Sequence, residues 1–114
     1  MSTPAFELTK KREVLWPITV NVPVDGGTEP HTIKINFRLL TKPEGARLAR
    51  LSFEDQEEKT LDYITNWEGV LDMEDKPVPF TRENLSALLE HEYIARAIAI
   101  GWREASAGLP AGTL

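Results

Sequence analysis

The sequence predicts an α+β fold in which an N-terminal antiparallel β-hairpin packs against about four α-helices. Two observations carry this prediction. Apolar and polar residues alternate over residues 14–39, and from Thr41 onward apolar residues recur at three- and four-residue spacing, as on helices. With 114 residues, of which 41% are hydrophobic, the chain fits one domain over residues 1–114 with a single core.

Two alternating runs predict the strands of the hairpin, which we assign to residues 10–40. The apolar face of the first predicted strand carries Val14, Trp16, Ile18, Val20 and Val22, and that of the second carries Ile33, Ile35, Phe37 and Leu39. Pro17 cannot donate to a ladder and so predicts an open edge on the first strand. The turn formers between Pro23 and Pro30 predict a longish, mobile loop. Residues 1–9 lack periodicity and are expected to be a flexible N-terminus.

The predicted helical part covers residues 41–107. Thr41 and Glu44 form a capping-box pattern that begins a short helix ending near Leu51. Ser52 is expected to cap a second helix. The buried stripe of that helix should carry Leu61, Ile64 and Trp67, with Gly69 at its end.

Two further helices are expected after a structured connector over residues 67–80. Thr81 caps the first of them, and the last runs from about Glu92 to Ser106. The last helix presents a wide apolar arc, made of Tyr93, Ile94, Ala97, Ile98 and Gly101. Residues 108–114 have no periodicity and are predicted to form a flexible tail.

Charge and composition argue against several partners. The chain has no cysteine and no long apolar stretch, so we expect a soluble cytoplasmic protein without a membrane segment or disulfides. Residues 1–50 carry a net charge of +3 and residues 51–114 one of −8. An acidic second half opposes phosphate backbones, so nucleic acid is not expected as a partner.

No pattern predicts a catalytic or metal centre. His91 lies between Glu90 and Glu92, but adjacent residues on a helix point about 100° apart and do not converge on one ion. His31 has only Glu29 nearby in the sequence. We therefore expect no enzyme activity, no cofactor, no metal and no small-molecule substrate.

Large aromatic residues are the candidates for protein binding. Such side chains most often belong to a core, but they are also enriched among the anchors of protein interfaces. The candidate protein-binding residues are Trp67, Phe80, Tyr93 and Trp102. The sequence leaves open whether each of them is a core residue or an interface residue.

The second part of the chain resembles the tail assembly chaperones of long-tailed bacteriophages. The resemblance covers about residues 33–107. It rests on a combination of motifs: Trp67-Glu68-Gly69-Val70, then Lys76-Pro77-Val78-Pro79-Phe80-Thr81, and then Tyr93-Ile94-Ala95-Arg96-Ala97. The chain departs from the usual turn by having Glu74-Asp75-Lys76 where glycine or asparagine is commoner.

The resemblance implies a non-catalytic protein that binds the tape measure protein during tail tube assembly in the host bacterial cytoplasm and is absent from the mature virion. We expect homo-oligomers, and we expect the open edge near Pro17 or the apolar arc of the last helix to meet another copy or the client. One alternative is a structural tail component retained in the virion, such as a connector or tube-completion protein. Another is a small enzyme with a pocket in which His31 or His91 meets a carboxylate.

Overall fold

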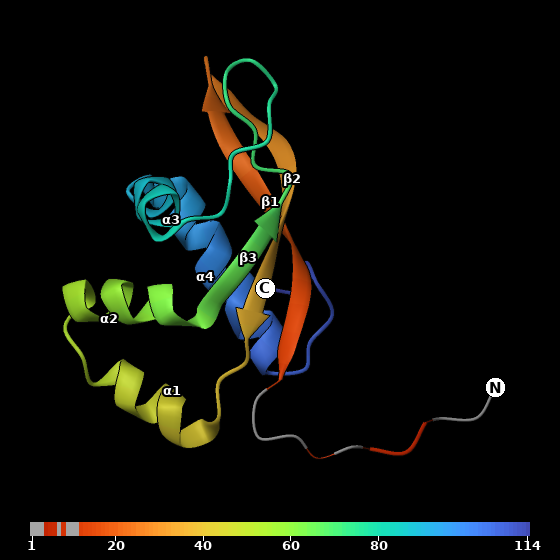
Figure 1. Cartoon of the computed structure of the whole chain (residues 1–114), viewed down its shortest axis with the longest axis vertical. Helices are drawn as coiled ribbons and strands as arrows, with labels where there is room; N and C mark the ends of the chain where they lie inside the picture. The colour runs from red at the N-terminus through yellow and green to blue at the C-terminus, as the bar shows by residue number, and fades with distance from the viewer. Residues whose placement is uncertain (1–3, 7, 9–11) are drawn as a thin grey trace.

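The structure, a computed structural model, describes residues 4–6, 8 and 12–114. Within these residues, a three-stranded antiparallel sheet of order β1-β2-β3 is combined with four α-helices (Figure 1). This confirms the α+β class, the N-terminal hairpin and the number of helices. Parts of two predicted segments lie outside the described residues, namely 1–3, 7 and 9 of the flexible N-terminus and 10–11 of the hairpin.

The hairpin is formed by β1 (Glu13–Val24) and β2 (Gly27–Arg38), which are joined by a two-residue turn. The predicted loop between Pro23 and Pro30 is therefore wrong. Gly26 adopts a φ of 76° in the turn, a conformation that glycine reaches without strain. Because β1 lies at the edge of the sheet, the open edge predicted from Pro17 is confirmed.

The predicted second helix is correct only in its first half. Helix α2 (Phe53–Thr60) ends where a short 3₁₀ turn, η1 (Leu61–Tyr63), begins, and strand β3 (Ile64–Glu68) follows. Trp67 therefore lies on a strand, opposite Ile35 of β2. Apolar side chains also recur every three residues where a 3₁₀ turn leads into a strand. The spacing of Leu61, Ile64 and Trp67 therefore could not distinguish a longer helix from a 3₁₀ turn followed by a strand.

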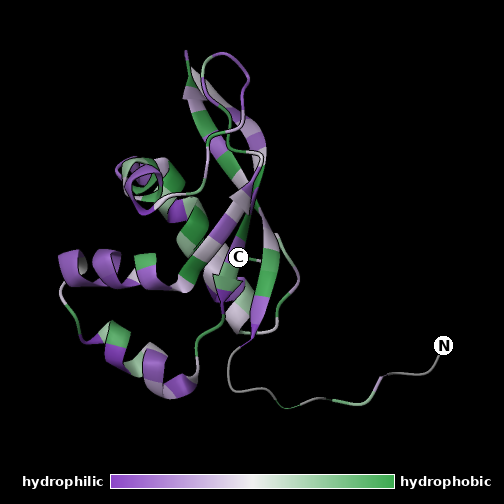
Figure 2. Ribbon diagram, in the orientation of Figure 1, coloured by the Kyte–Doolittle hydropathy of each residue, from purple (hydrophilic) through white to green (hydrophobic). Residues whose placement is uncertain are grey.

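The remaining helices agree with the sequence. They are α1 (Lys42–Ala49), α3 (Arg82–Leu89) and α4 (Glu92–Ser106). The predicted caps are present: the side chains of Thr41, Ser52 and Thr81 each accept a backbone N–H bond at the start of α1, α2 and α3. Figure 2 shows α1 and α2 as mainly hydrophilic helices, whereas α4 carries more apolar residues.

The connector after β3 forms a small β-bridge between Leu71 and Pro77, with a tight turn at its end. Asp75 adopts a φ of 60° in this turn, the left-handed conformation that favours glycine or asparagine. The Asp72 side chain accepts bonds from the N–H groups of Glu74 and Lys76. The connector is thus ordered by local hydrogen bonds.

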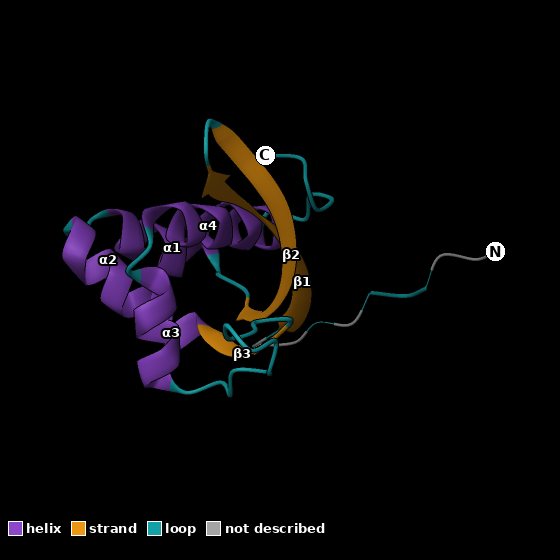
Figure 3. Ribbon diagram, turned by 90° about the horizontal axis from the view of Figure 1, so that it is seen from above, coloured by secondary structure: helices purple, strands orange, loops and turns teal. Residues whose placement is uncertain are grey.

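The core lies between the sheet and the helices, which gather on one side of the sheet (Figure 3). Its buried members come from the three strands and from α3 and α4: Ile18, Val20, Ile35, Phe37, Ile64, Trp67, Leu85, Ile98 and Trp102. Among the helices, α4 buries the most residues, because it packs along β1. None of the helices in the described part of the chain is long and apolar enough to cross a membrane.

Candidate functional site

A surface hollow with a volume of about 850 Å³ lies between the open edge of β1 and helix α4. We call it the edge groove. Its strand side is formed by Pro17, Thr19 and Asn21, and its helix side by Tyr93, Ala97 and Ile100. The strand edge and part of the apolar arc, which the sequence offered as alternatives, therefore line one groove: Tyr93, Ala97 and Gly101 of the arc face it, whereas Ile98 is buried in the core.

The helix packs closely on the strand at the base of the edge groove because Gly101 has no side chain. A Cβ atom at this position would lie 2.0 Å from Cδ1 of Ile18 and 3.3 Å from Cδ1 of Trp16. Ile18 itself is buried. The close approach fixes α4 to β1 and so sets the width of the groove.

A buried carboxylate, that of Glu104, lines the edge groove. Glu104 on α4 is only 3% exposed, and its Oε2 accepts a 2.9 Å hydrogen bond from the backbone N–H of Leu114. The indole N–H of Trp16 lies 3.5 Å from its other oxygen. The Leu114 bond is the main cause that lowers the pKa of Glu104, helped by the N–H groups of Gly112 and Thr113, although burial acts in the opposite direction.

The C-terminal segment makes these bonds because it turns back at the end of α4. Gly108 adopts a φ of 73°, and the N–H of Leu109 donates to the carbonyl of Glu104. Ala111 and Leu114 then line the edge groove. The segment that the sequence suggested as a flexible tail is thus placed against α4, and the link to Glu104 had no local signal in the sequence.

The four predicted protein-binding aromatics lie in different places. Tyr93 lines the edge groove and is half-buried. Trp67 and Trp102 are core residues with 6% and 4% exposure, and their indole N–H groups donate to the carbonyls of Val78 and Arg38. A partner docked on this structure would not reach them. Phe80 packs edge-on against Trp67, with 5.2 Å between ring centroids, and is not part of the groove.

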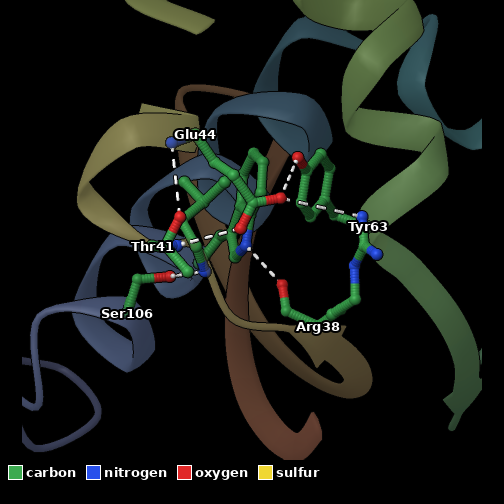
Figure 4. Close-up of polar contacts among 7 residues, drawn as sticks. Arg38, Thr41, Glu44, Tyr63 and Ser106 are labelled. Atoms are coloured by element: carbon green, nitrogen blue, oxygen red, sulfur yellow. Dashed lines mark hydrogen bonds and ion pairs between the residues drawn. The ribbon is translucent and has the colours of Figure 1, made fainter. Parts of the chain in front are cut away.

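A second polar cluster fastens α1 to the rest of the fold (Figure 4). The hydroxyl of Tyr63 donates a 2.7 Å bond to Glu44, whose other oxygen accepts from the backbone N–H of Thr41. The guanidinium of Arg38 lies 4.4 Å from the centroid of the Tyr63 ring and 4.0 Å from Glu44. The Tyr63 bond is the main cause that lowers the pKa of Glu44, and burial raises that of Tyr63.

Neither histidine is among the residues that line the edge groove. Nε2 of His31 is 3.1 Å from Glu29, and both side chains are exposed on the hairpin. His91 precedes α4 and is exposed, near the ring of Tyr93. Among the described residues, no group of three or more His, Cys, Asp or Glu side chains is placed to hold a metal ion.

Comparison of the chain with protein-family models, curated proteins and solved structures finds no significant match.

Proposed function

We propose that this chain is a non-catalytic polypeptide-binding protein, namely a phage tail assembly chaperone that binds the tape measure protein during tail tube assembly. The edge groove is the observation that carries the proposal. It joins unpaired backbone of an edge strand to apolar side chains of α4, the two features that proteins use to hold other polypeptides. The particular client follows from the resemblance in sequence described above.

The lining of the edge groove suits an amphipathic helical client. Ile100 is 37% exposed at the groove and Tyr93 is half-buried, so both present apolar surface to a docked segment. The nearby charges of Glu92 and Arg96 form a polar border on the same helix. This arrangement covers an apolar stripe while the outer surface of the chaperone stays charged.

In this proposal the protein acts in the host bacterial cytoplasm, forms homo-oligomers and leaves before the virion is complete. Mass spectrometry of purified virions tests the last point. A chaperone is absent from the particles, whereas a retained tail component would be present at a fixed copy number.

Co-expression with a tape measure protein tests the proposal directly. We expect the two to co-purify and the tape measure protein to become more soluble. Ile100→Asp places a charge in the edge groove and should abolish co-purification. The matched control is Met73→Asp on the connector, because Met73 is fully exposed (102%) outside the groove.

Two results would contradict the proposal. The first is a wild-type chain that neither co-purifies with the tape measure protein nor changes its solubility. The second is binding that survives Ile100→Asp but is lost in Met73→Asp, which would place the client on the connector.

A further inference from the structure

The backbone of β1 has a defined outward-facing set of hydrogen-bonding groups. The N–H of Leu39 donates to the carbonyl of Arg12, which makes these two residues a hydrogen-bonded pair at the start of the hairpin. In an antiparallel ladder such pairs alternate, and the register runs without a break to Val24 opposite Gly27. The odd-numbered residues of β1 therefore direct their backbone groups toward the open edge.

Prolines limit this edge to a short segment. Pro17 and Pro23 are both odd-numbered, so they have no N–H where an added strand would need one, and their rings obstruct it. Between them, Thr19 and Asn21 keep both the N–H and the carbonyl free for pairing. Thr19 and Asn21 also line the edge groove. The edge thus accepts a strand over about three residues and resists longer pairing.

We propose that a second copy of this chain pairs with this segment, antiparallel, about a twofold axis at Val20. In this register Thr19 lies opposite Asn21 of the second copy, and the two pairs can exchange four hydrogen bonds. Pro17 then lies opposite Pro23 of the second copy. Because proline has no N–H, the pairing of Pro17 with Pro23 leaves no unpaired backbone N–H buried in the interface of either copy.

The charges on α4 fit the same symmetry. Glu92 and Arg96 are one helical turn apart on α4, and both line the edge groove, as do Thr19 and Asn21. Within the residues that the structure describes, neither makes an ion pair. A twofold axis normal to the sheet sets the two α4 helices antiparallel, which brings Arg96 of each copy toward Glu92 of the other. Reciprocal opposite charges favour a second copy over an unrelated strand.

The dimer does not require a client, and it covers part of the groove proposed for the client. A client and a second copy should therefore compete for the edge. The dimer can be tested on the purified chain alone, so its failure leaves the co-purification result to decide the proposed function separately.

Sedimentation of the purified full chain over a range of concentrations tests the proposal. We expect a monomer–dimer equilibrium in the wild type. Thr19→Pro removes an outward N–H without disturbing the ladder to β2, as Pro17 and Pro23 already do, and should raise the dimer Kd at least tenfold. The control Thr19→Val keeps the N–H and should leave the Kd within about twofold. Circular dichroism checks that Thr19→Pro is folded.

Charge exchange provides a second arm on exposed side chains that leave the strand untouched. Arg96→Glu and Glu92→Arg should each weaken the homodimer, and an equimolar mixture of the two variants should form a heterodimer. A wild type that stays monomeric at the highest attainable concentration would overturn the proposal. So would a dimer that is unaffected by Thr19→Pro and by both charge reversals.

Discussion

Helices α1 and α4 carry similar residues in different surroundings. Each has an interior glycine, Gly45 or Gly101, and a carboxylate with a lowered pKa, Glu44 or Glu104. No residue of α1 is buried, whereas α4 buries residues against both the sheet and the C-terminal segment. Helix α1 is thus held by its cap and a few polar contacts, while α4 organises the core and the edge groove.

Truncation of a core residue on α4 should have the largest effect. Trp102 packs against Phe37 and Tyr63, with ring centroids 6.4 and 5.1 Å away, so Trp102→Ala should lower the free energy of unfolding by about 3–5 kcal/mol. The half-buried Leu48 on α1 is the control, and Leu48→Ala should cost only about 1 kcal/mol. Urea denaturation measures both. Equal losses would remove the distinction between the two helices.

The two glycines should respond to alanine in opposite directions. Gly45 has no atom within 4 Å of its missing Cβ, so Gly45→Ala should stabilise the fold by about 1 kcal/mol through helix propensity. Gly101→Ala forces Ile18 to move and should destabilise by about 1–2 kcal/mol. Thermal and urea unfolding report both effects.

A double variant checks the cause of the Gly101 effect. Ile18→Val removes the Cδ1 atom that lies closest to the added Cβ, so the loss caused by Gly101→Ala should shrink in that background. If the two changes are simply additive, the contact with Ile18 does not explain the need for glycine.

Acid should weaken both carboxylate clusters, with the smallest effects. Because the folded-state pKa of Glu44 and of Glu104 is lowered, their stabilisation is present above the unfolded value of about 4.3 and is lost as the pH falls through the folded pKa. Glu44→Gln and Glu104→Gln should each make stability less dependent on pH in this range. Thermal unfolding between neutral and acid pH measures the change.

The two glutamine variants should differ in their effect on the C-terminal segment. Glu104→Gln should speed amide hydrogen exchange at Leu114, because a neutral amide oxygen is a weaker acceptor than a carboxylate. Glu44→Gln should leave Leu114 unchanged. Faster exchange at Leu114 in both variants would show that the C-terminal segment does not depend on Glu104.

Local features of this fold could be predicted from sequence, and long-range ones could not. The caps at Thr41, Ser52 and Thr81 depend on residues three positions apart, and the bounds of α4 follow from its own periodicity. Strand β3 is decided by its pairing with β2, which no local spacing reveals.

The candidate site likewise contains residues that the sequence indicated and residues that only the fold brings together. Pro17 indicated the open edge and Tyr93 the apolar arc, so both walls of the edge groove were visible in the sequence. Glu104 was not, because its partners Trp16 and Leu114 become neighbours only after folding. The burial of Trp67 and Trp102 likewise depends on the assembled core, which is why composition left their roles open.

We expect the edge of β1 between its two outward prolines to pair with a second copy of the chain. Residue-resolved amide hydrogen exchange tests this pairing most directly. In the dilute chain, Thr19 and Asn21 should exchange fast while Ile18 and Val20 are protected by the ladder to β2. Raising the protein concentration should protect Thr19 and Asn21, because a second copy pairs with their backbone groups. If both stay fast while the dimer is demonstrably formed, pairing at this edge is contradicted.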